Sequence, residues 1–181
     1  MVKTKYSVGL FRSQNTLSWL VYGFSALLLM LLQMAPRCFP VVMNARPEPL
    51  VLLVVCVAMF EGPYFGAGIG VLAGLLWDLY SFRVFGLHAM LLMLIGVAVG
   101  LLVQLILRTN FLSGMLLCMY AVLVHTFLEW LLCYVLFLND ESIAVLLNVY
   151  LPNALYTVLL SPFVYLITLL LARMLRRQKR Q

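Results

Sequence analysis

Charged side chains are scarce in this sequence. Lysine, arginine, aspartate and glutamate make up 10% of its 181 residues, and only six residues are acidic. Soluble domains carry about a quarter charged residues, so this chain cannot cover itself with a surface that faces water. Hydrophobic residues reach 65% of the total. The chain is therefore expected to be an integral membrane protein with little left over for a soluble domain.

Motifs for catalysis and for cofactor binding are also missing. The cysteines form no CxxC pair, and the stretch GAGIGVLAG lacks the lysine of a phosphate-binding loop. No Ser-His-Asp spacing, nucleophile elbow or heme motif is present. Cys56, Cys118 and Cys133 lie in apolar runs and are expected to be small core residues, whereas Cys38 could meet an oxidising compartment. The sequence thus predicts neither an enzyme nor a bound cofactor or metal.

The basic residues gather at the two ends of the chain. Eight of the twelve flank the apolar region: Lys3, Lys5, Arg12, Arg173, Arg176, Arg177, Lys179 and Arg180. This distribution is typical of cytoplasmic anchors beside anionic lipid headgroups and not of a surface that binds nucleic acid. Both termini are therefore expected in the cytoplasm, which requires an even number of membrane crossings.

Apolar runs divide the chain into a cytoplasmic segment, 1–16, a single membrane domain, 17–172, and a basic cytoplasmic tail, 173–181. The predicted fold class is all-α, with six transmembrane helices in one bundle. Their expected bounds are about 17–35, 47–60, 64–79, 87–107, 111–138 and 150–172. The first of these is expected to remain as an uncleaved span, because no cleavage site of small residues follows it.

The second apolar run, 50–60, is too short to cross a hydrocarbon core of roughly 30 Å. Because Glu61-Gly62-Pro63 follows as a tight turn, the second and third helices should form a hairpin. The hairpin either crosses the membrane twice or enters and leaves from one side. Six crossings place nine basic residues inside and three, Arg37, Arg46 and Arg83, outside, so the charge rule favours six.

Glycine recurs at every fourth position of the third predicted helix, at Gly66, Gly70 and Gly74. This spacing clears a strip of side chains, so that another helix can approach until the backbones nearly touch. Gly96 and Gly100 repeat the spacing in the next helix. We expect all five glycines to serve helix packing inside the domain or contact with a partner's helix.

Asp78 takes the next place in the same series, at the outer end of the third helix. The helix dipole disfavours a carboxylate there, so Asp78 should pair with Arg83 or His88. Alternatively, it accepts hydrogen bonds from the backbone that follows. Together with Gly86, these residues are predicted to form a structural corner between two helices, or else to contact a partner or ligand.

His125 and Glu129 lie one helical turn apart in the longest apolar run and are expected near the middle of the membrane. An acid at that depth is costly unless it is paired, which favours a buried hydrogen bond within the bundle or to a partner helix. A proton relay or half of a metal site are the alternatives. The HxxxE spacing differs from the zinc motif HExxH, and the sequence shows no second ligand pair.

The stretch from Ala45 to Met90 resembles the signature of the MreD family, the rod shape-determining membrane proteins of bacteria. The resemblance rests on three features. These are a proline-bounded helix start, a helix with regularly spaced glycines that ends in Asp-Leu, and a Phe-Gly pair that opens the next span. In this sequence these residues are Arg46, Pro47, Gly70, Gly74, Asp78, Leu79, Phe85, Gly86 and Leu87. The family often has glycine soon after the Asp-Leu pair, where this chain has Tyr80-Ser81-Phe82.

The resemblance implies a non-enzymatic scaffold of the Rod complex in the bacterial inner membrane. Such a scaffold binds MreC and acts with MreB filaments, RodA and its transpeptidase partner in lateral peptidoglycan synthesis. The glycine strip and the outer loop would then receive other transmembrane helices, and a homodimer is possible.

The resemblance also implies a fold similar to the substrate-binding subunits of energy-coupling-factor vitamin transporters. A vitamin-binding subunit of such a transporter is therefore the alternative function. In that family, a patch of small residues on the first helix contacts the coupling subunit. The first span here offers only the neighbouring pair Ser25 and Ala26 for such a patch.

Overall fold

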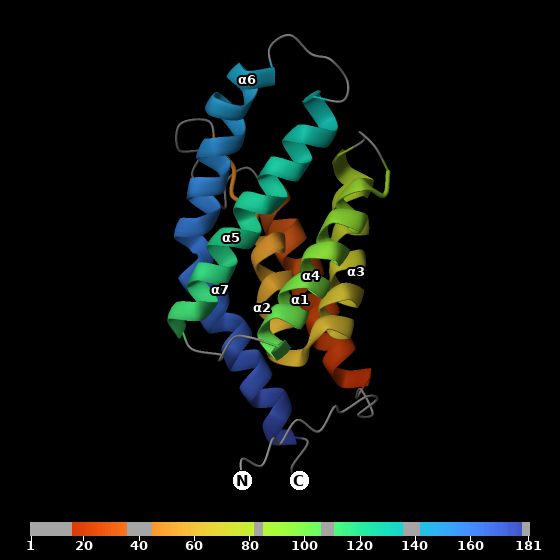
Figure 1. The fold of residues 1–181 in the computed structure, drawn as a ribbon. Helices are drawn as coiled ribbons and strands as arrows, with labels where there is room; N and C mark the ends of the chain where they lie inside the picture. Colours follow the sequence, from red (N-terminus) through yellow and green to blue (C-terminus); the bar gives the residue numbers. More distant parts are fainter. Residues whose placement is uncertain (1–15, 36–44, 82–84, 106–110, 136–141, 179–181) are drawn as a thin grey trace.

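The computed structural model describes residues 16–35, 45–81, 85–105, 111–135 and 142–178, and the regular elements in these ranges are helices (Figure 1). They form six continuous helical segments. The first four are α1 (Thr16–Met34), α2 (Pro49–Glu61), α3 (Pro63–Ser81) and α4 (Leu87–Leu105). The fifth is α5 (Phe111–Trp130) with the π-helical η1 (Leu131–Val135), and the sixth joins α6 (Ser142–Val145), η2 (Leu146–Tyr150) and α7 (Leu151–Gln178).

The first five segments begin within two residues of the starts expected from the sequence. The last segment differs, because helical backbone already begins at Ser142, ahead of the expected start at 150. The expected ends at residues 107 and 138, like Arg83 and Cys38, lie outside the described residues. Four helices in the described ranges are long and apolar enough to cross a membrane: Thr16–Met34, Leu87–Leu105, Phe111–Cys133 and Leu146–Leu175.

The short helix α2 forms the centre of the bundle. It contacts α1, α3, α4, α5 and α7, and its residues from Pro49 to Met59 are all buried. A helix that is apolar on every side is stable only when other helices surround it. This accounts for the absence of a polar face in the sequence of α2, and for its position behind α4 and α5 in Figure 1.

Helices α3 and α4 pack antiparallel against each other through the predicted glycines. A Cβ atom added to Gly70 would lie 2.5 Å from the backbone oxygen of Leu92, and one added to Gly74 would lie 2.3 Å from Ala89 Cα. Gly66 and Gly96 face each other in the same way, and Gly100 faces Pro63. Close helix packing inside the domain is therefore the observed use of the strip. The expectation that this strip receives a partner's helix is wrong, because α4 already covers it.

A tight turn joins α2 to α3. Gly62 adopts φ +102°, a conformation that favours glycine, and its N–H donates to Ala58 O. The turn lies beside Gln104, since a Cβ atom added to Gly62 would lie 3.2 Å from Gln104 Nε2. The hairpin thus reaches the level of the last residues of α4, although α2 has only 13 residues.

The segment before α2 is fixed to α7 by two polar side chains. Asn153 Oδ1 accepts the backbone N–H of Arg46 at 2.8 Å, and Thr157 Oγ1 accepts that of Glu48 at 2.9 Å. Thr157 in turn donates to Asn153 O at 2.7 Å. These bonds determine where the chain enters the bundle, and therefore where the side chain of Glu48 is placed.

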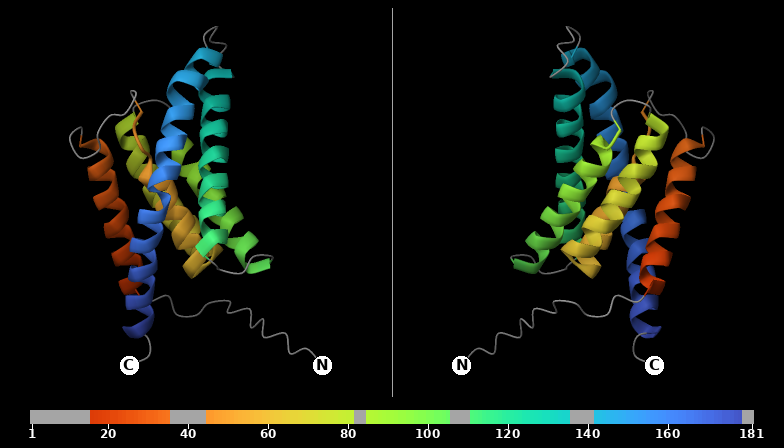
Figure 2. Two further views of the ribbon diagram at one scale, coloured as in Figure 1. Left: turned by 90° about the vertical axis from the view of Figure 1, so that its left-hand side faces the viewer. Right: turned by 90° about the vertical axis from the view of Figure 1, so that its right-hand side faces the viewer.

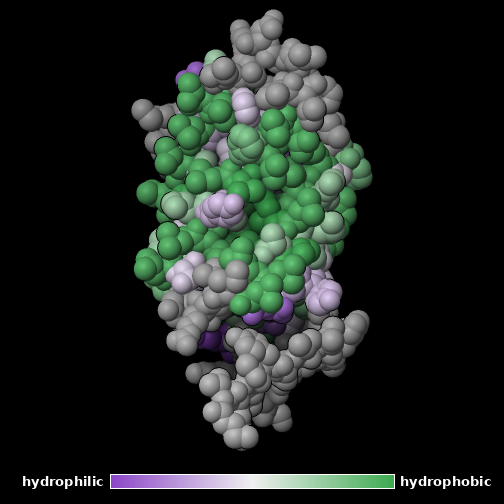
Figure 3. Space-filling view, viewed as in Figure 1, coloured by the Kyte–Doolittle hydropathy of each residue, from purple (hydrophilic) through white to green (hydrophobic). Residues whose placement is uncertain are grey.

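Large apolar side chains cover the outside of the bundle. Figure 3 shows a face over α4, α5 and α7 that is mostly hydrophobic, with isolated polar residues. The views in Figure 2 place α1 and α5 on opposite sides of the molecule. Exposed apolar surface on this scale is unfavourable in water but suits contact with lipid.

Candidate polar site at one end of the bundle

Five ionisable side chains from four parts of the chain meet at the end of the bundle where α1 and α3 end and α4 begins. All of them are buried or nearly buried in an otherwise apolar protein. The five are Glu48 before α2, Asp78 on α3, His88 on α4, and His125 and Glu129 on α5.

Asp78 accepts hydrogen bonds from the start of α4. Its two oxygens receive the backbone N–H groups of Gly86, His88 and Ala89 at 2.9 to 3.2 Å. Its Oδ1 also lies 2.7 Å from His88 Nδ1. The first N–H groups of a helix have no partner within that helix, so a carboxylate placed there stabilises the helix start. The structure therefore pairs Asp78 with both His88 and the following backbone, the two arrangements that the sequence left open.

His88 links this corner to α5. Its Nε2 lies 3.5 Å from Glu129 Oε1, and its ring stacks on Trp77 at 4.7 Å between centroids. Tyr150 donates to the same oxygen of Glu129 at 3.4 Å. Glu129 therefore lies at the junction of α4, α5 and η2.

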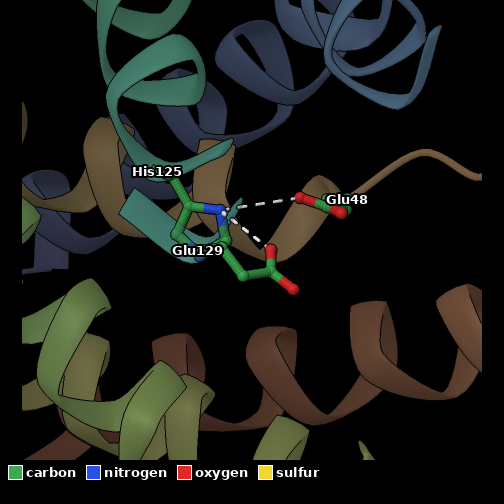
Figure 4. A group of neighbouring side chains, drawn as sticks. All are labelled: Glu48, His125 and Glu129. Atoms are coloured by element: carbon green, nitrogen blue, oxygen red, sulfur yellow. Dashed lines mark ion pairs between the residues drawn. The ribbon is translucent and has the colours of Figure 1, made fainter. Parts of the chain in front are cut away.

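His125 is fully buried, and its ring faces two carboxylates (Figure 4). Its Nδ1 lies 3.6 Å from Glu48 Oε2 and 4.0 Å from Glu129 Oε2. These distances are too long for hydrogen bonds. Because Glu48 precedes α2 and His88 begins α4, the pair His125 and Glu129 lies level with helix ends. Their expected depth near the middle of the membrane stays a prediction.

The electrostatics of the cluster are dominated by burial. Glu48 lies outside the candidate spans, and its side chain is 13% exposed. Burial, with a further contribution from the charge of Glu129, raises the pKa of Glu48 well above its usual range. Two carboxylates this close together need a proton or a cation between them.

The cluster opens into a cavity of about 320 Å³. Residues from every neighbouring element line this cavity, including Gln33, Arg46, Glu48, His88, Glu129, Tyr150 and Asn153. The cavity is large enough to hold a small polar molecule or several waters. A polar entrance therefore leads from the end of the bundle to the buried carboxylates.

Glu48 is the residue that sequence reasoning missed. His125 and Glu129 are one turn apart and easily paired by inspection, but Glu48 reaches them only through the fold. One signal was available, namely an acid between two prolines immediately before an apolar helix. Such an acid must be buried at the start of the helix, where it needs a partner.

Comparison with protein families gives a match over most of the chain. The family model for the rod shape-determining protein MreD matches residues 13–175, which is nearly the whole chain. No curated protein and no solved structure matches. The match includes all five ionisable residues and the glycine-packed helices.

Proposed function

Because the chain belongs to the MreD family of rod shape-determining proteins, we propose that it is a non-enzymatic scaffold of the membrane machinery for lateral wall synthesis. The family match over residues 13–175 is the observation that carries this proposal. In the proposed role the protein lies in the bacterial inner membrane with both termini in the cytoplasm. It binds MreC directly, and through it acts with MreB, RodA and the transpeptidase partner of RodA.

The proposed contact with MreC is a contact between helices. The described ranges contain no soluble domain, so a partner must be met mainly through the membrane-facing surface. The glycine strip on α3 is covered by α4 and cannot supply this contact. We therefore place it on α1, which has the smallest buried share of the four candidate spans.

One face of α1 has the spacing of a helix-packing seam. Leu20, Phe24, Leu27 and Leu31 follow one another at intervals of four, three and four residues, and all are exposed. This spacing keeps side chains on one side of a helix and suits a second helix that crosses at a small angle. Gly23 adds a gap on this helix, because a Cβ atom there would meet nothing within 4 Å.

Co-purification tests the proposal. Tagged protein, extracted in mild detergent from cells that express MreC, is expected to retain MreC and to restore rod shape in a strain without its own MreD. Leu27→Trp should lower MreC recovery severalfold at unchanged protein level. The matched control is Leu159→Trp on α7, which is exposed to 78% on another helix.

The outcomes separate the two parts of the proposal. Failure of the unmodified protein to retain MreC would overturn the scaffold role. If MreC is retained and both tryptophan variants retain it equally, the contact lies elsewhere than on α1. Unchanged cell shape and protein level in a His125→Ala, Glu129→Ala variant would exclude catalysis by these two residues.

A small-molecule function is the second candidate, and the cavity of about 320 Å³ is the observation that favours it. A fold similar to vitamin-binding transporter subunits remains part of this proposal. Against it, Ala26 is fully buried and Ser25 donates to Tyr22 O, so neither forms an exposed patch for a coupling subunit. Mass spectrometry of purified protein decides the matter, because a transporter subunit should carry a stoichiometric vitamin-like ligand.

A further inference from the structure

We propose that Glu48, His125 and Glu129 bind one divalent transition-metal cation, with zinc as the expected ion. His88 lies outside this group of three and becomes a fourth ligand only if its ring moves toward the site. One oxygen of each glutamate and one nitrogen of His125 lie within 4.8 Å of one another. The cation would hold the start of α2 against α5. This role is structural, and it does not depend on which partner the protein binds in the cell.

The first support is the state of His125. Its side chain is 0% exposed, and among the described residues neither ring nitrogen has a hydrogen-bond partner. Buried polar atoms are almost always satisfied, because an unpaired one loses its bonds to water and gains nothing in return. His125 Nδ1 points between two carboxylates (Figure 4). A cation at that point would give the nitrogen a partner and would contact both carboxylates.

The second support is the size of the gap. His125 Nδ1 is 3.6 Å from Glu48 Oε2 and 4.0 Å from Glu129 Oε2. Ligand atoms around a tetrahedral zinc ion, with bonds of about 2.1 Å, lie about 3.4 Å apart. The two distances from His125 Nδ1 exceed this spacing by about 0.2 and 0.6 Å, and all three ligand atoms lie within 4.8 Å of one another.

The third support is the arrangement of Asp78 and His88. In the neutral ring of His88, Nδ1 donates to Asp78 Oδ1 at 2.7 Å, so Nε2 carries the lone pair. That nitrogen lies 3.5 Å from Glu129 Oε1, at the edge of the proposed site. A carboxylate that orients a histidine through its other nitrogen is the usual outer partner of a metal-bound histidine. Asp78 is thus a positioning residue for His88.

The set of donor atoms indicates the class of metal. Imidazole nitrogen together with carboxylate oxygen suits zinc and its neighbours in the first transition series, whereas calcium and magnesium prefer oxygen alone. Two glutamates also balance the charge of one divalent cation. Glu48, His88 and Glu129 line the cavity, which provides a route for a hydrated ion from the end of the bundle.

Metal binding can be measured directly on the full chain. Protein purified through a tag without histidines, stripped with a chelator and titrated with Co²⁺, should show the visible absorption of tetrahedral cobalt at one equivalent. Zn²⁺ should displace this signal and should raise the thermal unfolding temperature. Glu48→Gln should weaken cobalt binding by more than about 100-fold, since loss of an outer partner alone costs 10- to 100-fold.

A glutamate at the other end of α2 provides the control. Glu61→Gln changes the same residue type at the last residue of α2, but Glu61 contacts Tyr22 and lies outside the cluster, so cobalt affinity should stay unchanged. The proposal is overturned if the unmodified protein binds no cobalt and gains no thermal stability from zinc. It is also overturned if Glu48→Gln, folded by gel filtration, binds cobalt as well as Glu61→Gln does.

Discussion

Gly70 shows what a single residue contributes to this bundle. A Cβ atom at this position would lie 2.5 Å from the oxygen of Leu92, which belongs to the backbone of α4 and cannot move aside. We expect Gly70→Leu to push α3 away from α4 and to lower the free energy of unfolding by about 3 kcal/mol or more, at the upper end of overpacking effects. Unfolding by sodium dodecyl sulfate in mixed micelles measures this loss.

Gly23→Leu is the matched control for this change. Gly23 is also a glycine in a membrane helix, but a Cβ atom there meets nothing within 4 Å. Its replacement should leave stability within about 0.5 kcal/mol of the unmodified protein, the usual range for surface substitutions. Equal losses in both variants would show that leucine is costly at any glycine of these helices, and that contact with the covering helix α4 does not determine the effect.

At the residue scale, the sequence predicts that a residue makes a close contact better than it predicts which residue lies on the other side of that contact. Glycine at every fourth position indicates that another helix packs closely, because only backbone atoms then limit the distance between the two helices. It does not say which helix approaches, since that depends on the register of α4, where Gly96 meets Gly66. Glu48 illustrates the harder case, because nothing near it in the chain predicts His125 as its neighbour.

At the scale of elements, the segment before α2 depends on α7. Thr157 is fully buried and accepts the backbone N–H of Glu48, so it determines where that carboxylate enters the cluster. Thr157→Val keeps the shape of the side chain but leaves the N–H unpaired. We expect a loss of about 1 to 3 kcal/mol in the free energy of unfolding, measured by unfolding in sodium dodecyl sulfate as for Gly70→Leu.

Thr168→Val provides the comparison within the same helix. Thr168 is equally buried, and its hydroxyl donates to Val164 O, one turn back in α7. Its loss should cost clearly less than the loss of Thr157, because Thr168 accepts no backbone N–H from the segment before α2, so none is left unpaired there. A similar cost for both variants would mean that the bond to Glu48 contributes little to the fold.

The element scale also shows why helix lengths were harder to predict than helix starts. Prolines and tight turns mark the starts, since Pro49 and Pro63 each open a helix. The length of α2 follows instead from the space at the centre of the bundle. An apolar run without periodicity cannot distinguish a short span from a central helix that five others surround.

At the scale of the whole molecule, the number of crossings follows from the depth of the α2–α3 turn. Four helices in the described part of the chain are long and apolar enough to span a membrane. Helix α3 is not among them, and α2 with 13 residues is too short by length alone. Its turn nevertheless lies beside Gln104 and so reaches the level at which α4 ends. The polar cavity lies at the other end of the bundle, and Glu48, which immediately precedes α2, lines it.

This geometry favours two crossings by the hairpin over a re-entrant pair, and cysteine labelling can decide between them. Tyr64, exposed to 75% just after the turn, and Phe85, exposed to 70% just before α4, mark the two ends of α3. In a background with Cys38→Ser and Cys133→Ser, Tyr64→Cys should react with a membrane-impermeant maleimide only after the inner membrane is opened. Phe85→Cys should react in cells whose inner membrane is intact.

A re-entrant hairpin makes a different prediction for the same pair of variants. It would leave Tyr64 within the membrane, out of reach of the reagent from the cytoplasm, while Phe85 would still be labelled from outside. Cys56 and Cys118 are buried and should contribute no background. Labelling of Tyr64→Cys from the cytoplasmic side therefore requires α3 to cross completely. With α2 crossing beside it, the cavity and its carboxylates would open toward the side on which the wall is built.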